Sequence, residues 1–484
     1  MKESVGTSGL IFNEPLLWEK GATGRIGFSM PRRDVEAADF DDSLAGGGPD
    51  FPDLSELAVI RHFTRLSQWN FGVDSGIYPL GSCTMKYNPK TNERQAALTG
   101  FAGAHPLLPS SLSQGVLKIM FDLEGYLAEI TGLPAVTLQP AAGSHGELTG
   151  MMIFYAYHKS KGAPRSKVLI PDTAHGTNPA SAALCGFKAV AVKSNKEGIL
   201  SPETIAELMD EETAGIMVTN PNTLGLFEEN LRQVADIVHA KGGLVYGDGA
   251  NMNAVMGIVD MQAMGVDVLH LNLHKTFSTP HGGGGPGSGP VCVTKELERF
   301  LPVPRVVENS GTYSLSEDYP DSVGKLHAFY GNVGVLIKAY SYILSLGADL
   351  KKVSQFAVLS ANYIKENLKE VFHLPYDKPC MHECVFTDKI QQAHKVSTLD
   401  IAKRMMEYGF HPPTIYFPLV VQGAIMVEPT ETECKEDIDG FIETMRTIAE
   451  EARQHPELLL QAPTTPKVGR LDEVGAARHP CLAG

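Results

Sequence analysis

Short apolar runs alternate with longer, helix-like segments between about residues 111 and 330. The runs have the length of buried strands, and the segments between them repeat apolar residues at the spacing of one helix face. We predict strands at residues 135–140, 166–172, 214–220, 244–250 and 267–273, with helices at 146–160, 178–186 and 229–243. This alternation is typical of a mainly parallel sheet with helices on both faces, and therefore of an α/β fold.

The rest of the chain differs in composition and in the pattern of apolar residues, and the whole chain divides into four parts. Residues 1–110 are rich in glycine, proline and aspartate, which indicates an N-terminal arm, and residues 111–330 form the large α/β domain. Residues 331–461 combine helical segments with two strand-like runs, which predicts a smaller α+β domain. The polar, proline-bearing residues 462–484 indicate an extended tail.

Polar residues follow the predicted strands at the positions where a ligand would bind. In an open parallel sheet, ligands bind outside the carboxyl ends of the strands. Four of the predicted strands end at or are followed by His175, Asn220, Asp248 and Lys275. The strand at 135–140 is followed by a turn that contains Gly143, Ser144 and His145, and then by a helix. We therefore expect these side chains to meet at one edge of the sheet.

Lys275 and Asp248 are the candidates whose chemistry is most specific. A strand-end aspartate commonly caps a turn, and a lysine is usually a solvated surface charge. Lys275, however, follows an apolar strand and precedes a glycine-rich stretch at 282–289, where the backbone can pass close to another group. A desolvated lysine amine is a nucleophile that forms imines. With a carboxylate to hold a ring nitrogen, the pair meets the requirements of pyridoxal phosphate.

The other candidates fit the same cofactor less specifically. The turn Gly143, Ser144 and His145 precedes a helix N-terminus, where backbone N–H groups favour a phosphate, although a glycine turn is often only a turn. His175 would lie flat on the cofactor ring, or would instead be a loop histidine bonded to its neighbours. Asn220 would bond the ring hydroxyl, or would form a turn before Pro221.

Composition and charge exclude several classes of function. The chain has 484 residues, is 43% hydrophobic and carries a net charge of -15, so nucleic acid is not expected as a partner. The first residues lack the features of a signal peptide, and no run of apolar residues approaches membrane-spanning length. The seven cysteines form an odd, scattered set, which favours reduced thiols and a cytoplasmic protein.

A metal site is not expected beside Lys275, although three histidines, His270, His274 and His281, surround it. If His270 and His274 lie on one strand, their spacing of roughly 13 Å is too wide for one ion. Cys380 and Cys384 lack a second pair of ligands, so we interpret them as buried, apolar thiols.

Several motifs together resemble a known family. They are the residues around Lys275 (HLNLHKTF, then HGGGGPG), YGDGANMNA at Asp248, AHGTNPASA at His175, YPLGSCTMKYNP at 78–89, HEC at 382–384, and GFHPPT and MVEPTE. This combination, over nearly the whole chain, resembles the glycine dehydrogenases (decarboxylating), the P-proteins of the glycine cleavage system. The length and the opening LIFNEPLLWEKGATGRIGFSMP are similar to the separate, lysine-bearing second subunit of that family.

The resemblance implies a fold, a cofactor and a reaction. The family has the aminotransferase-like fold type I of the pyridoxal enzymes. By motif, Lys275 would form the imine with the cofactor, Asp248 would pair with its ring nitrogen, His175 would pack on the ring, and residues 143–145 would meet its phosphate. Ser144 stands where the family often has alanine, so only its backbone role is implied.

The implied reaction is the decarboxylation of glycine and transfer of its aminomethyl group to the lipoyl arm of a separate H-protein. The implied assembly contains two copies each of this chain and of a first P-protein subunit. Other fold type I activities, such as an aminotransferase or an aldolase, stay open as alternatives. So does a non-catalytic subunit that only scaffolds a partner, against which Lys275 argues.

Overall fold

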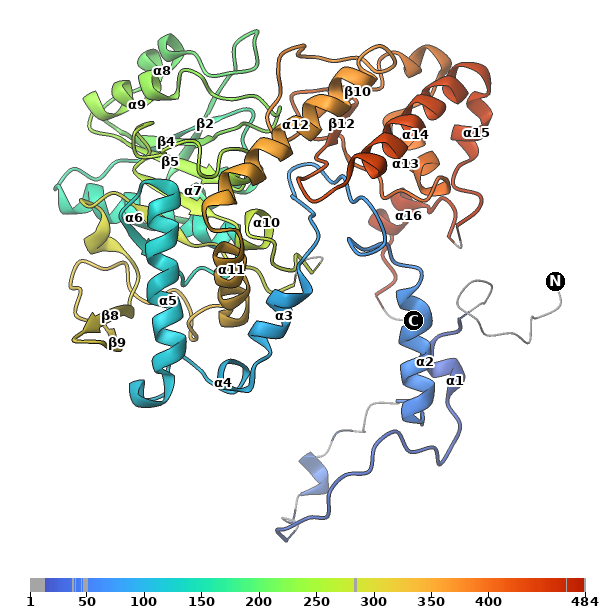
Figure 1. Cartoon of the computed structure of the whole chain (residues 1–484), viewed down its shortest axis with the longest axis horizontal. Helices are drawn as coiled ribbons and strands as arrows, with labels where there is room; N and C mark the ends of the chain where they lie inside the picture. Colours follow the sequence, from blue (N-terminus) through green and yellow to red (C-terminus); the bar gives the residue numbers. More distant parts are fainter. Residues whose placement is uncertain are drawn as a thin grey trace. The chain divides into compact units, whose positions relative to one another are not determined.

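The computed structural model describes residues 14–36, 39, 41–44, 46, 51–282, 285–466 and 468–482 (Figure 1). The chain divides into two compact units, residues 1–75 and 76–484. The boundaries predicted near residues 110, 330 and 461 lie within the second unit and stay predictions.

Among its described residues, the first unit contains three elements, α1 (Leu17–Lys20), η1 (Asp42–Leu44) and α2 (Glu56–Ser67). The hydroxyl of Ser55 accepts a hydrogen bond from the Ala58 N–H and so caps the start of α2. The carboxylate of Glu14 accepts from His62 at 2.7 Å and Arg65 at 3.0 Å, both on α2. This carboxylate therefore joins the residues before α1 to α2.

The second unit is built on a sheet whose described strands are seven in number and follow the order β1-β7-β6-β5-β4-β2-β3. The strands β2 to β6 pair in parallel, as predicted, whereas β7 runs antiparallel to both of its neighbours. The strands β3 and β7 were not predicted. The bounds are β1 (Ala135–Thr137), β2 (Lys167–Pro171), β3 (Lys188–Val192), β4 (Thr213–Thr219), β5 (Leu244–Gly249), β6 (Val268–Leu271) and β7 (Val291–Val293).

Helices cover both faces of this sheet because successive strand residues point to opposite sides. On β2, Leu169 packs in one core cluster with α5 (Ser110–Thr131) and α9 (Leu231–Ala240). Val168 and Ile170 pack in another with α6 (Gly143–Ser160) and α7 (Thr177–Leu184). The α/β fold class is thereby confirmed.

Further helices surround the sheet in the second unit. The helix α11 (Val333–Leu346) packs against α5 and α3 (Lys90–Ala96), and Figure 1 shows α11 beside the long α5. The remaining elements before β10 are α4 (Thr99–Ala102), α8 (Pro202–Leu208), η2 (Met252–Ala254), α10 (Leu273–Thr276), η3 (Glu298–Phe300), the hairpin β8 (Arg305–Asn309) and β9 (Thr312–Ser316), η4 (Gly347–Asp349) and α12 (Leu350–Leu368).

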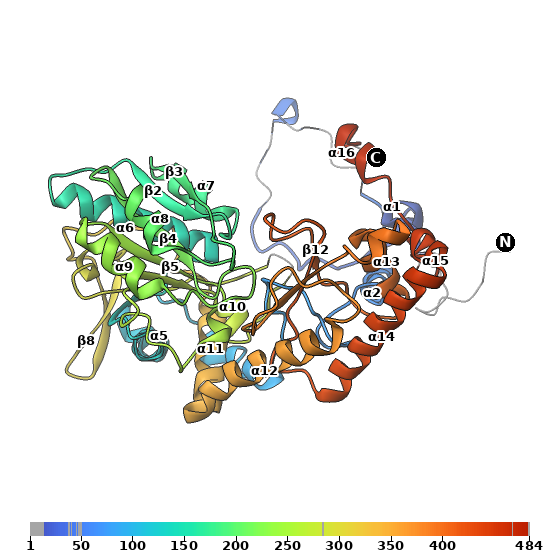
Figure 2. The ribbon, with the colours of Figure 1, turned by 90° about the horizontal axis from the view of Figure 1, so that it is seen from above.

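A second, antiparallel sheet of order β10-β12-β11 has its own core in the C-terminal part. Its strands are β10 (Cys384–Thr387), β11 (Thr414–Ile415) and β12 (Ala424–Val427). The helices α12, α13 (Thr398–Glu407), α14 (Lys435–Gln454) and α15 (Pro456–Gln461) contribute to or contact this core, and Figure 2 shows α13, α14 and α15 gathered near β12. Cys380 and Cys384 are buried in it, as their interpretation as apolar thiols predicts. The 3-10 helix η5 (Gln391–His394) precedes α13.

The tail beyond residue 461 is held by specific polar contacts. The guanidinium of Arg470 donates to Asp400 at 2.6 Å and to the backbone oxygens of Leu459 and Ala462. Residues Glu473–Arg478 form the short helix α16. These contacts anchor the tail to α13 and α15.

One stretch qualifies the expectation that no segment reaches membrane-spanning length. The helices α11, η4 and α12 follow one another as Val333–Leu368, and a window of this stretch is apolar enough to cross a membrane by length and composition. Buried residues of α11, such as Leu336, belong to the core of the large sheet, and those of α12, such as Ile364, to the core of the small sheet. Both helices therefore contribute residues to the packed cores of the two sheets, and one third of the apolar window is buried.

Candidate functional site

A cavity of about 250 Å³ lies at the carboxyl ends of β4, β5 and β6. Its lining includes five of the predicted residues, which come from four separate segments: Gly143, Ser144, His175, Asp248 and Lys275. Short parallel strands bring these segments together because their carboxyl ends meet at one edge of the sheet.

Lys275 lies at the base of this cavity and is only 9% exposed. The strand β6 ends at Leu271, and Lys275 belongs to the one-turn helix α10. The assumption that His270 and His274 share a strand was therefore wrong, since His274 is on α10. The Lys275 amine donates a hydrogen bond of 2.7 Å to the backbone oxygen of Ser82.

Asp248 lies on β5, and hydrogen bonds to both of its carboxylate oxygens fix its orientation. The Asn178 amide donates to Oδ2 and the Ala250 N–H donates to Oδ1, each at 3.0 Å. The Nε2 atom of His270 lies 3.5 Å from Oδ1. Burial lowers the pKa of His270 although the charge of Asp248 raises it. A buried carboxylate held in this way can receive a proton-bearing ring nitrogen of a ligand.

His175 begins a chain of hydrogen bonds that reaches a buried acid. Its Nδ1 lies 2.9 Å from the Thr177 hydroxyl, which donates to Glu147 at 2.7 Å. The Ser181 hydroxyl also donates to Glu147. Burial, and then the charge of Asp248, raise the pKa of Glu147 to about 7. Glu147 was not predicted as a site residue, because it lies inside the predicted helix and not at a strand end or in the Gly143 turn.

The helix α6 begins at Gly143 with the features of an anion-binding N-terminus. Its N-cap, Ala142, provides no side-chain cap, and its first turn contains no acidic residue among the described positions. The surroundings leave no space for a side chain at two glycines. A Cβ at Gly143 would lie 2.5 Å from Asn272 Oδ1, and one at Gly289 would lie 2.0 Å from the oxygen of Ala142. Residues 283 and 284 of the glycine-rich stretch lie outside the described residues.

Two predicted residues lie outside the lining of the cavity. The side-chain oxygen of Asn220 accepts from the Glu228 N–H, at a distance of 3.0 Å. The Nδ1 atom of His145 accepts from the Ala141 N–H at 3.2 Å, and its ring lies 5.3 Å from that of His327. Their side-chain roles in cofactor binding stay predictions.

The cavity also contains groups that no strand-end argument could find. Ser82 and Cys83 line it, and they come from the segment before α3. Glu383 precedes β10 and Glu428 follows β12, and both carboxyls contact that segment. The motifs containing these residues were used only for the family resemblance, because the strand-end rule addressed the large sheet alone.

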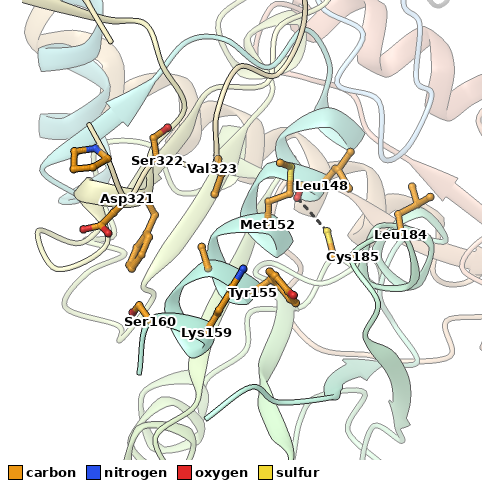
Figure 3. A pocket seen from close by; sticks show the side chains of 13 residues that line it. Leu148, Met152, Tyr155, Lys159, Ser160, Leu184, Cys185, Asp321, Ser322 and Val323 are labelled. Carbon is orange, nitrogen blue, oxygen red and sulfur yellow. Dashed lines mark hydrogen bonds between the residues drawn. The ribbon is translucent and has the colours of Figure 1, made fainter. Parts of the chain in front are cut away.

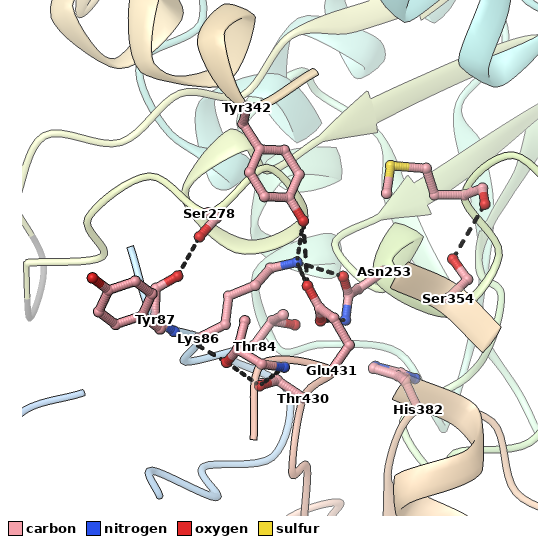
Figure 4. A network of polar contacts seen from close by, with 12 residues as sticks. Thr84, Lys86, Tyr87, Asn253, Ser278, Tyr342, Ser354, His382, Thr430 and Glu431 are labelled. Atoms are coloured by element: carbon pink, nitrogen blue, oxygen red, sulfur yellow. Dashed lines mark hydrogen bonds and ion pairs between the residues drawn. The ribbon is translucent and has the colours of Figure 1, made fainter. Parts of the chain in front are cut away.

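A network centred on Lys86 holds the same segment a few residues farther on (Figure 4). The Lys86 amine donates to Glu431 at 2.7 Å, to Asn253 at 2.8 Å and to the Tyr342 hydroxyl at 3.4 Å. Burial lowers the pKa of Lys86, whereas Glu431 raises it. This lysine thus has three polar partners in a packed environment and connects the segment with η2, α11 and the residues after β12.

The polar atoms of the cavity fit a cofactor such as pyridoxal phosphate. Two lining side-chain atoms, Thr219 Oγ1 and Asn272 Oδ1, are buried without a hydrogen-bond partner among the described residues. Buried polar atoms normally have partners, so these two indicate a bound polar group. An amine, a fixed carboxylate and an uncapped helix N-terminus lie around the same space, and they match an aldehyde, a ring nitrogen and a phosphate.

Two buried groups of side chains have ligand atoms within 4.8 Å of one another: Glu147, Asp248 and His270, and His382, Glu383 and Glu428. In both groups the carboxylates already accept hydrogen bonds from protein N–H or O–H groups. The prediction that the site uses no metal stays a prediction.

A larger cavity of about 760 Å³ lies elsewhere on the second unit (Figure 3). It is lined by residues of α6 and α7 and by residues 320–323, with Leu148, Met152 and Tyr155 among them. The predicted site residues do not line it. Its size alone gives no reason to assign it the chemistry of the Lys275 cavity.

Comparison with known sequences gives two family matches and many full-length relatives. Residues 353–463 match the family described as glycine dehydrogenase, C-terminal domain, and residues 149–306 match aminotransferase class-V. A protein of Caldanaerobacter subterraneus subsp. tengcongensis named probable glycine dehydrogenase (decarboxylating) subunit 2 is 56% identical over 96% of this chain and 98% of its own length. A Listeria innocua protein of the same name is 54% identical over 97% of each chain.

Solved structures share the fold. A crystal structure of glycine decarboxylase (P-protein) of the glycine cleavage system, in inhibitor-bound form, has a TM-score of 0.72 at 22% identity and covers 84% of this chain and 92% of its own. An aspartate aminotransferase of Thermus thermophilus has a TM-score of 0.59 at 15% identity, over 78% of this chain and 99% of its own.

Proposed function

This chain belongs to the family of glycine dehydrogenase (decarboxylating) subunit 2, and we propose that its Lys275 cavity is the catalytic site of that enzyme. Its activity is the pyridoxal-phosphate-dependent decarboxylation of glycine in the glycine cleavage system. The observation that carries the site proposal is the buried Lys275 amine, which faces the same cavity as the fixed carboxylate of Asp248.

We assign the cofactor contacts as follows. Lys275 would hold the cofactor aldehyde, Asp248 its ring nitrogen, and His175 one face of the ring. The backbone N–H groups of the turn Gly143, Ser144 and His145 would hold the phosphate. When bound, the cofactor supplies an electron sink for the charge left on the substrate carbon as carbon dioxide departs.

The chain's own residues supply orientation and a group that holds a proton. Asn178 and the Ala250 N–H keep Asp248 in one rotamer, so its charge faces the cavity. Glu147 holds or releases a proton near neutral pH because its pKa is about 7. Thr177 lies between Glu147 and His175 and connects this acid to the cavity.

The proposal includes partners. We infer that the aminomethyl group passes to the oxidised lipoyl arm of an H-protein, whose disulfide is reduced as the new carbon–sulfur bond forms. The name "subunit 2" of the relatives implies a first subunit, and we propose an assembly with two copies of each. We also propose a cytoplasmic location, which the scattered cysteines support.

Borohydride reduction followed by peptide mapping tests the site directly. We expect the cofactor mass on the peptide containing Lys275, and no labelled peptide in the variant Lys275→Ala. Carbon dioxide release from glycine should require lipoylated H-protein. Release of a keto acid, or retained activity in Lys275→Ala, would support the aminotransferase or the scaffolding alternative instead.

A further inference from the structure

The segment Ser82, Cys83 and Thr84 has an unusual backbone beside the Lys275 amine. Ser82 has φ 65° and Thr84 has φ 45°, so two residues with side chains adopt the left-handed region within three positions. This region is unfavourable for a β-branched residue such as Thr84. Such a conformation persists only where the surroundings hold it, and it is often found at functional sites.

Two buried carboxyls hold this segment. Glu383 accepts from the Ser82 N–H at 2.8 Å, and Glu428 accepts from the Thr84 N–H at 3.0 Å and from the Thr84 hydroxyl. Both glutamates are 0% exposed. They lie at the adjacent ends of the paired strands β10 and β12, since Cys384 is opposite Val427. The small sheet therefore fixes the backbone at the wall of the cavity.

Close packing next to the segment leaves little freedom for its backbone. Leu80 forms a bridge with Val427, and the Thr414 hydroxyl donates to the oxygen of Gly81 at 2.7 Å. A Cβ at Gly81 would lie 2.2 Å from the Met426 side chain. The chain enters the segment along β12, and the two glutamates then set the direction of the peptide groups that follow.

The result of this arrangement is a hydrogen-bond acceptor for Lys275. The oxygen of Ser82 faces the cavity and accepts from the Lys275 amine at 2.7 Å. We propose that Glu383 and Glu428 are positioning residues, which hold Ser82 so that its carbonyl oxygen receives the Lys275 amine whenever that amine is not bonded to the cofactor. The role of Lys275 in this inference rests on the proposed function.

Electrostatics agrees with the geometry. Burial raises the pKa of Glu428 to about 7, although its bonds with Thr84 and the charge of Lys275 oppose the rise. Burial, and then the charge of Glu428, raise the pKa of Glu383 well above its usual value, while Lys275 lowers it. Lys275 thus affects the pKa of both carboxyls, which agrees with their position beside the segment that holds its amine.

The remaining contacts of the pair do not compete for this role. Burial lowers the pKa of His382 to about 3, so the adjacent imidazole is neutral. Lys86 is bonded to Glu431, Asn253 and Tyr342, and it lowers the pKa of Glu428 only from a distance. Ser82 and Thr84 thus supply the direct hydrogen-bond donors to the pair among the described residues.

Competitive labelling of lysines in the cofactor-free, full-length protein tests the inference without measuring turnover. Reductive methylation with trace formaldehyde, from about pH 6 to about pH 10, gives the midpoint at which Lys275 becomes reactive, and mass spectrometry reads its peptide. The exposed Lys295 serves as an internal standard. The other titratable groups that face the Lys275 amine stay unchanged in all variants: Cys83, Glu147, His175, Asp248, His270, His274, His281 and His382.

The double variant Glu383→Gln/Glu428→Gln should lower the Lys275 midpoint by about one pH unit or more, because nearby negative charge favours the ammonium form. Each single variant should shift it less in the same direction. Glu228→Gln is the matched control, since Glu228 is a buried carboxyl with a pKa of about 7 that also accepts a backbone N–H, outside the Lys275 cavity. It should leave the midpoint unchanged.

A variant that preserves both carboxyls separates positioning from charge. Thr84→Val removes the hydroxyl donor to Glu428 and should increase the Lys275 labelling rate at neutral pH severalfold, because Ser82 is then held less firmly. If circular dichroism shows that the double variant is unfolded, Thr84→Val decides alone. Labelling identical to the wild type in the folded double variant, or in Thr84→Val, would overturn the inference. Failure of borohydride mapping at Lys275 would instead overturn the proposed function.

Discussion

Two buried lysines, Lys275 and Lys86, illustrate how the same side chain serves different purposes in one fold. Lys86 donates to a carboxylate, an amide and a hydroxyl in a packed environment. Lys275 donates to one backbone oxygen at the edge of a cavity. A lysine whose amine donates three hydrogen bonds in packed surroundings has a structural role. A lysine whose amine donates one hydrogen bond beside a cavity is available for chemistry.

The variant Lys275→Ala should show the largest effect on activity. We expect the rate of glycine decarboxylation to fall by on the order of a thousandfold or more, because this residue acts as a unit with its neighbours. The unfolding midpoint should change little, since the lost hydrogen bond is a single one. Carbon dioxide release and thermal denaturation, measured on the same preparation, check both statements, and a large loss of stability with retained turnover would reverse the comparison.

Lys86→Met should have the opposite profile. Removal of the amine leaves the carboxylate of Glu431 buried without its charge partner, which lowers the free energy of unfolding by about 3–5 kcal/mol. Denaturant titration measures this loss. Part of the stability should return in Lys86→Met/Glu431→Leu. A protein as stable as the wild type would show that the network in Figure 4 is not a structural link.

Asp248→Asn tests whether the charge opposite Lys275 matters more than its shape. Asparagine preserves the size of the side chain but removes the negative charge that would keep a ring nitrogen protonated. We expect a decrease in turnover of about a hundredfold, in the range of losses for a positioned proton-holding group. The absorption spectrum of the cofactor-bound protein should change as well. Equal turnover in both proteins would remove Asp248 from the site.

The smallest expected effect concerns Glu147 beside the cavity, and it appears in how the free energy of unfolding changes with pH. The folded-state pKa of Glu147 is raised from 4.5 to about 7, so the folded protein binds its proton more tightly than the unfolded chain. This contribution to stability is complete below pH 4.5 and is lost as the pH rises through about 7. In Glu147→Gln the decrease should be smaller by roughly 2 kcal/mol, measured as unfolding free energy against pH. An unchanged slope would contradict the raised pKa.

Local patterns predicted the parallel strands of the large sheet other than β3, and candidate residues at their ends. The strands at β2, β4, β5 and β6 were found because short apolar runs between helical segments have few other structures available. The strand-end rule then gave Lys275, Asp248 and His175 as candidates, and all three line one cavity in the structure. The short strand β7, which lies between β1 and β6, was missed, since three residues after a glycine-rich stretch give too little periodic signal.

By itself, therefore, the sequence determined the fold class, the family and the residues that follow the parallel strands. Only the tertiary structure showed that Glu383 and Glu428 meet the backbone of Ser82 and Thr84, 301 and 344 residues away along the chain. Only the tertiary structure ended β6 at Leu271 and placed Lys275 on a helical turn. Periodicity and spacing report contacts between near neighbours, whereas these contacts depend on how two separate sheets pack against one segment.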